Sequence, residues 1–287
     1  MRHINFIRFI ACASVAARFL VNFEVSRAAP PSSAAYTVSC GNSTIQGTMM
    51  GGGVSYMNGS PLPWIWMEYW DGTGNATWTE LDSYGTSNSG WFTGTQTYSV
   101  SQNCVAVDNY RYNPPGHPFI YFVNPDGTGL NYVNELAYGN VAADTAVRVT
   151  KANLMGPPPA VAICNAATMR GTYVTSSLET IGSNVQARLT RRSFDGAGNL
   201  TYREDIEPAG GGTVTRMAGT GTYSVSSTCQ VRISHSLSGQ STVVNQALIS
   251  PDGSAYWWVN VMNTGVYAAG KAIRVSMNSV NNATLSP

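Results

Sequence analysis

The chain is short of charged residues, and this shortage limits what it can bind. Asp, Glu, Lys and Arg make up 11% of its 287 residues, where about a quarter is typical of soluble domains. The formal net charge is +1, and no basic run alternates with aromatic residues, so we expect no nucleic-acid partner. Gly, Ser, Thr and Asn are abundant instead, a mixture typical of short strands joined by frequent turns.

Residues that would carry metal or nucleophile chemistry are also scarce. The chain has three histidines and no Cys-x-x-Cys pair, so we expect no metal site and no cofactor. It has no Gly-x-Ser-x-Gly motif, and we find no catalytic triad. The sequence therefore assigns no catalytic residue.

Long apolar runs are missing as well, because none after residue 29 approaches the length of a membrane-spanning helix. The first 29 residues differ from the rest: Arg2, His3 and Arg8 precede an apolar stretch, and Ser26-Arg27-Ala28 resembles a cleavage site. We interpret residues 1–29 as a secretory leader. This predicts a secreted or periplasmic protein; a mis-assigned start or a disordered tail is the alternative.

What the chain does contain is an internal repeat with an offset of about 125 residues. Matched landmarks in one order are hard to obtain by chance, so we predict two copies of one domain. The matched pairs include Thr44–Thr48 with Thr168–Thr172, Asp71–Asn75 with Asp195–Asn199, Gly94–Val100 with Gly219–Val225, and Pro125–Gly127 with Pro251–Gly253. The predicted organisation is leader 1–29, domain 36–153, Pro-rich linker 154–160, domain 161–278 and tail 279–287.

Four cysteines outside the leader occupy equivalent positions in the two copies. An even number in an exported chain favours disulfides. Of the three possible pairings, only Cys40–Cys104 with Cys164–Cys229 closes an equivalent loop in each copy, so we predict these two bonds.

Each copy reads as eight short strands separated by turn residues, and no segment has sustained helical periodicity. In the second copy the predicted strands are 171–181, 185–194, 200–206, 214–225, 229–236, 243–249, 255–261 and 271–277. Eight consecutive hairpin-linked strands favour an all-β fold of two tandem antiparallel up-and-down barrels. β-Sandwiches are the alternative.

A resemblance to a known group rests on the turn Phe194-Asp-Gly-x-Gly-Asn199 and on Gly-Thr-Tyr223-Ser-Val followed by a cysteine. These features are similar to a repeat in uncharacterised secreted bacterial proteins with a lipocalin-like barrel. The first copy departs from the pattern at Trp70. The resemblance implies the fold and export, and it implies no activity.

The first copy also holds an aromatic cluster that the second largely lacks. Trp64, Trp66 and Trp70 share one strand face with Glu68, because side chains alternate with period two. At the positions of Trp64, Trp66 and Trp70, the second copy has Arg188, Thr190 and Phe194. The candidate ligand-binding residues are Trp64, Trp66, Glu68, Trp70, Trp78 and Trp91.

Two alternatives stay open for these faces. The tryptophans could simply fill the first barrel or pack against the second copy. In the second copy, Arg188 and Arg192 could point inward and hold an anion, but we expect them to lie on a solvated outer face.

Three functions therefore compete. We rank first a non-enzymatic binding protein that takes a small apolar molecule or a glycan at the tryptophan-rich face. A structural or surface-interaction protein with filled barrels comes second. A small barrel isomerase or hydrolase comes third, and it predicts converging acids or arginines inside one barrel.

Overall fold

The computed structural model describes residues 39–85, 87–109, 118–135, 141–156, 163–182, 184–208, 211–236, 242–261 and 265–275. The predicted leader, most of the predicted linker and the predicted tail lie outside these residues. No helix in the described part is long and apolar enough to cross a membrane.

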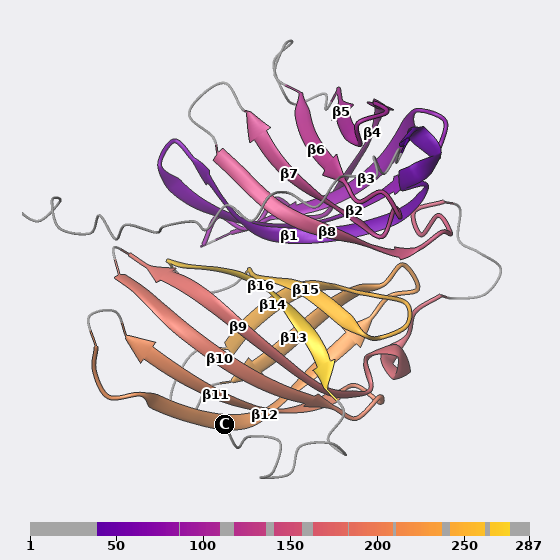
Figure 1. The fold of residues 1–287 in the computed structure, drawn as a ribbon. Helices are drawn as coiled ribbons and strands as arrows, with labels where there is room; N and C mark the ends of the chain where they lie inside the picture. Colours follow the sequence, from indigo (N-terminus) through magenta and orange to yellow (C-terminus); the bar gives the residue numbers. More distant parts are fainter. Residues whose placement is uncertain are drawn as a thin grey trace, which may run out of the picture. The chain divides into compact units, whose positions relative to one another are not determined.

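The chain forms two closed antiparallel barrels of eight strands each, which confirms the all-β prediction (Figure 1). The first barrel consists of β1 Gly47–Met57, β2 Ser60–Trp70, β3 Asn75–Asp82, β4 Phe92–Val100, β5 Val105–Asp108, β6 Phe119–Val123, β7 Gly129–Glu135 and β8 Val141–Thr150. The second consists of β9 Gly171–Ile181, β10 Asn184–Phe194, β11 Asn199–Pro208, β12 Thr215–Val225, β13 Gln230–Ser236, β14 Thr242–Ile249, β15 Ala255–Asn260 and β16 Val266–Val275.

Each strand pairs with its neighbours in sequence, and the ends of each sheet meet. β1 pairs with β8 in the first barrel, and β16 pairs with β9 in the second. Closure leaves neither sheet with a free edge, and the sandwich alternative is therefore wrong. Two short 3₁₀ helices, η1 Asn42–Ile45 and η2 Ala166–Met169, precede β1 and β9.

The last strand begins earlier than the sequence suggested, at Val266 rather than Lys271. The reason is Gly270, which lies inside β16 and does not interrupt it. A Cβ at this position would lie 3.0 Å from Nε1 of Trp258. The glycine therefore makes room for an indole ring on the neighbouring strand.

The Asp-Gly-x-Gly-Asn segments form the turns after β2 and β10. Asp71 Oδ1 accepts hydrogen bonds from the backbone N–H of Thr73 at 2.7 Å and of Asn75 at 3.0 Å. The Asp195 carboxylate accepts equivalent bonds in the second barrel. Gly72 and Gly196 adopt φ angles of 80° and 82°, which favour glycine.

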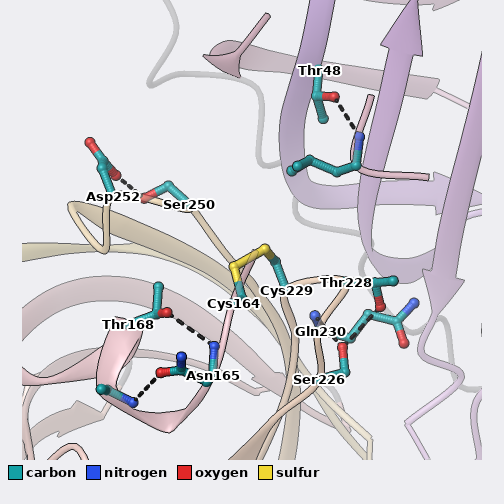
Figure 2. The surroundings of a disulfide bond; sticks show 12 residues. Thr48, Cys164, Asn165, Thr168, Ser226, Thr228, Cys229, Gln230, Ser250 and Asp252 are labelled. Atoms are coloured by element: carbon teal, nitrogen blue, oxygen red, sulfur yellow. Dashed lines mark hydrogen bonds between the residues drawn. A yellow bond between two sulfur atoms is a disulfide. The ribbon is translucent and has the colours of Figure 1, made fainter. Parts of the chain in front are cut away.

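The disulfides Cys40–Cys104 and Cys164–Cys229 both form, as predicted. Figure 2 shows the second bond beside η2, where the Asn165 side chain accepts from the N–H of Ala167 at 2.9 Å. Disulfides persist in oxidising compartments, which agrees with a protein that works outside the cytoplasm. The matched tyrosines each hydrogen-bond to one of the two 3₁₀ helices. The hydroxyl of Tyr98 donates to the carbonyl of Asn42 in η1, and that of Tyr223 donates to the carbonyl of Ala166 in η2.

Candidate functional site

The candidate site lies inside the first barrel, on the inward face of β2. Trp64, Trp66 and Trp70 belong to one buried cluster with Phe119, Tyr121 and Tyr132 of the same barrel. The face that the sequence left undecided therefore points inward.

The interior has two levels along β2. Trp70 is fully buried at the η1 end, where its ring lies 4.5 Å from that of Tyr98 and 5.4 Å from that of Tyr121. Trp64 is six residues away, which corresponds to about 20 Å along a strand, and it remains 8% exposed. The η1 end is thus packed shut, and the remaining access is toward the end that carries Trp64.

A cavity of about 30 Å³ lies between these levels. Its lining comes from five strands and consists of Trp64, Trp66, Glu68, Trp78, Glu80, Gln96, Phe119, Tyr121 and Tyr132. A cavity of this size admits a group of about the size of a water molecule and is too small for a sugar ring.

Aromatic rings enclose the cavity with fixed geometry. The ring centroid of Tyr132 lies 5.7 Å from that of Trp64 and 5.8 Å from that of Trp66, both in edge-to-face arrangement. Trp66 Nε1 donates to the Tyr132 hydroxyl at 3.3 Å. These edge-to-face contacts fix the orientations of the three rings relative to one another.

Carboxyl groups share the same space. Gln96 Nε2 donates to Glu68 Oε1 and, at 2.7 Å, to Asp108 Oδ2. Tyr121 donates its hydroxyl proton to Asp108. The remaining polar atom of the amide, Gln96 Oε1, is buried with no hydrogen-bond partner among the described residues. A ligand with N–H groups would satisfy this acceptor.

The environment makes these acids hard to ionise. Burial, together with the negative charges of Asp108 and Glu80, raises the pKa of Glu68 well above its usual value. Burial likewise raises the pKa of Asp82, which hydrogen-bonds to Glu80, to about 6. Protons therefore remain on part of this cluster at a pH where exposed carboxyl groups have lost theirs.

The second barrel places basic groups at the same ladder positions. Arg188 Nη2 lies 2.7 Å from Glu179 Oε2, and its Nη1 lies 2.6 Å from Glu204 Oε2. Arg192 is 2% exposed, donates to the Tyr256 hydroxyl at 3.3 Å and lies 5.5 Å from the centroid of Trp258. The expectation of a solvated arginine face is therefore wrong. Arginine is buried here because two glutamates neutralise it.

In the second barrel the pKa of a buried glutamate is lowered, whereas in the first barrel it is raised. Burial alone would raise the pKa of Glu204, but the nearby His235, whose Nε2 lies 3.7 Å from Glu204 Oε1, and the charges of Arg188 and Arg192 lower it to about 2. Burial, in turn, lowers the pKa of His235. Glu204 is consequently a fixed negative charge inside an ion-pair network with Arg188 and Arg192.

Most of the predicted site residues come together, and two do not. Trp64, Trp66, Glu68 and Trp78 line the cavity, whereas Trp70 lies below it and Trp91 is outside its lining. Sequence reasoning missed Gln96, Phe119, Tyr121 and Tyr132. The later strands of the repeat carried a signal, because the register aligns Tyr121 with Ala247 and Gln96 with Gly221.

In the part of the chain that the structure describes, no three His, Cys, Asp or Glu side chains are grouped so as to hold a metal ion. No family model and no curated protein matches the chain. Among solved structures it is similar to a protein of unknown function from the DUF3598 family of Nostoc punctiforme, at 9% identity with a TM-score of 0.25. The match covers 81% of this chain and 97% of that chain.

Proposed function

We propose that this chain is an exported, non-enzymatic binding protein whose first barrel, of lipocalin-like type, holds a small molecule. The ligand contacts the aromatic rings and Glu68 around the cavity. The second barrel serves as the structural partner, because its interior is occupied by mutually neutralising side chains.

One observation carries the proposal: the two barrels share a scaffold and differ most where the cavity lies. Glu68 and Arg192 occupy the same ladder position, since each pairs with the strand before and the strand after in identical register. The fold therefore tolerates a filled, neutralised interior there. The first barrel instead has aromatic and carboxyl groups around a space, as small-molecule sites have.

The test is a titration of the whole protein with three panels of small molecules: fatty acids, monosaccharides and alkylamines. Because Trp64, Trp66 and Trp78 line the cavity, binding will change the tryptophan emission. Replacing Trp66 with Ala will weaken binding at least tenfold by calorimetry. Trp91→Phe is the matched control, since Trp91 lies outside the lining, and it will bind as the parent does.

The proposal fails if no panel gives saturable binding, or if Trp64→Ala and Trp66→Ala both bind as the parent does. The first result favours the alternative of two filled barrels with an external role. Circular dichroism of each variant separates lost binding from lost folding.

The enzymatic alternative has one observation in its favour. Glu80 and Asp82 hydrogen-bond to each other, and the pKa of Asp82 is raised to about 6, which suits a group that exchanges protons near neutral pH. Mass spectrometry of the bound molecule decides between the two functions. A binding protein returns the ligand unchanged, whereas a hydrolase or isomerase returns a product.

A further inference from the structure

The chemistry of the cavity narrows the class of ligand, and this inference rests on the proposed function. Its lining combines aromatic rings on several sides with carboxyl groups. A neutral ligand seldom needs both. Both attract positive charge, the rings through their negative faces and the carboxylates directly.

We propose that the first barrel binds the primary ammonium group of a small organic amine, with the Glu68 carboxylate and the Gln96 carbonyl oxygen as acceptors. A primary ammonium has three N–H donors and no acceptor, and the lining offers it two acceptors, Gln96 Oε1 and the ionised carboxylate of Glu68. The rings of Trp64, Trp66 and Tyr132 complete the enclosure.

Gln96 gives the evidence that is independent of the acids. Its side chain is 7% exposed and spans Glu68 and Asp108 with both N–H groups. That arrangement fixes the orientation of the amide and leaves Oε1 as a buried acceptor without a partner in the described residues. An unsatisfied buried acceptor is costly, and a donor placed in the cavity removes the cost.

The size of the cavity agrees with a cationic head group. About 30 Å³ accommodates an ammonium group but no ring. Among the lining residues, 8% of Trp64, 9% of Glu80, 7% of Gln96 and 6% of Phe119 is exposed, against 4% of Glu68. Because Phe119 stacks on Trp64 and Trp70 closes the η1 end, the proposed route for the amine is head first past Trp64.

Binding is linked to a proton. The titratable groups whose charges interact with Glu68 are Glu80 of β3, Tyr98 of β4, Asp108 of β5, Tyr121 of β6 and Tyr132 of β7. Burial and the charges of Asp108 and Glu80 raise the pKa of Glu68, which favours its protonated form in the free protein. The arriving ammonium displaces that proton to the buffer, so that the complex contains a carboxylate and the intact cation.

The same comparison predicts that the second barrel does not bind the ammonium group. Its Arg192 side chain occupies the position of Glu68 and lies over the ring of Trp258, while Trp258 corresponds to Tyr132 in the register. The second barrel therefore carries its own cation at the place where the first would receive one.

The experiment is isothermal titration calorimetry of the full chain at pH 7.5 with propylamine, propan-1-ol and tetramethylammonium. We expect propylamine to bind at least ten times more tightly than the alcohol, which has the same shape without the charge. Tetramethylammonium, which has the charge without donors, will bind more weakly than propylamine. Repeating the titration in two buffers of different ionisation enthalpy will reveal proton release.

Glu68→Gln keeps the shape of the side chain and removes the charge, so propylamine affinity will fall at least tenfold and proton release will disappear. Glu207→Gln changes the same residue type at an exposed position of β11 and will change neither. Gln96→Leu is the second variant, and it will weaken propylamine binding without abolishing proton release.

The outcomes separate the two proposals. If a sugar or a fatty acid binds and every amine fails, the binding function stands and the amine is wrong. If propylamine and propan-1-ol bind equally, or if Glu68→Gln binds as the parent does, the charge plays no part and the inference is overturned. If nothing in any panel binds, both proposals fall.

Discussion

At the scale of single residues, the same glutamate has opposite surroundings in the two barrels. Glu80 pairs with Trp66 in the ladder and Glu204 pairs with Thr190 at the equivalent position. Glu204 forms ion pairs with Arg188 and Arg192, whereas the charge of Glu80 raises the pKa of Glu68. One substitution should therefore have different effects in the two copies.

We predict that Glu204→Gln lowers the free energy of unfolding by about 3–5 kcal/mol, because Arg192 loses its carboxylate partner and Arg188 keeps only Glu179. Glu80→Gln will change it by no more than about 1 kcal/mol or will stabilise, because it removes a repulsion between buried acids. Urea unfolding at pH 7.5 measures both. Equal losses from the two variants would contradict the assignment of one compensated and one acidic interior.

At the scale of strands, both copies use a glycine to seat an aromatic ring on the neighbouring strand. Gly94 of β4 pairs with Trp78 of β3, and Gly219 of β12 pairs with Tyr202 of β11. A Cβ on Gly94 would lie 2.3 Å from Cζ2 of Trp78, and one on Gly219 would lie 2.6 Å from the Tyr202 hydroxyl. These glycines thus decide where a ring lies, and Trp78 is part of the cavity wall.

We predict that Gly94→Ala costs about 1–3 kcal/mol of stability, since it forces a buried ring to move, and also weakens ligand binding by narrowing the cavity. Gly41→Ala is the control, because nothing lies within 4 Å of a Cβ there; we expect a change within about 0.5 kcal/mol. Near-UV circular dichroism and urea unfolding measure the two effects. Preserved tryptophan signals in Gly94→Ala would show that the ring does not depend on this glycine.

At the scale of the whole molecule, the two barrels respond oppositely to pH. Burial raises the pKa of Asp144 to about 6, so its stabilising contribution is present below the unfolded value of 3.8 and is lost as the pH rises through 6. The pKa of Glu204 is lowered to about 2. Its contribution is therefore present above the unfolded value of 4.5 and is lost as the pH falls toward 2.

We predict that unfolding stability is greatest at about pH 4, where the gain through Glu204 and the loss through Asp144 balance, and declines on both sides. A shift of two pKa units corresponds to roughly 3 kcal/mol. Between pH 4 and pH 7 the parent will therefore lose on the order of 2–3 kcal/mol of unfolding free energy through Asp144, and Asp144→Asn will not show this loss. In the parent, the N–H of Gly52 donates to Asp144 Oδ2 at 2.8 Å. The asparagine of the variant keeps a side-chain oxygen that can accept this hydrogen bond. Denaturant titrations at pH 3, 5 and 7.5 test this, and a stability that increases steadily with pH in the parent would refute it.

The repeat made the architecture predictable from sequence. Matching two copies located the turns, the cysteine pairs and the strands, and β9 was predicted with its observed ends, Gly171 and Ile181. Each of these features depends on residues close in sequence or on equivalence between copies. The turn after β2 needs an aspartate and glycines within five positions, and nothing distant alters that requirement.

The sequence by itself also determined which residues share a strand face, because alternation places Trp64, Trp66 and Glu68 together. It did not determine which face is inside. Closure of the sheet decided that, and it brought Gln96, Tyr121 and Tyr132 from other strands to the same cavity. The inward position of Arg188 and Arg192 depended on glutamates from β9 and β11. A charged face is buried only when distant partners neutralise it, and only the tertiary structure supplies those partners.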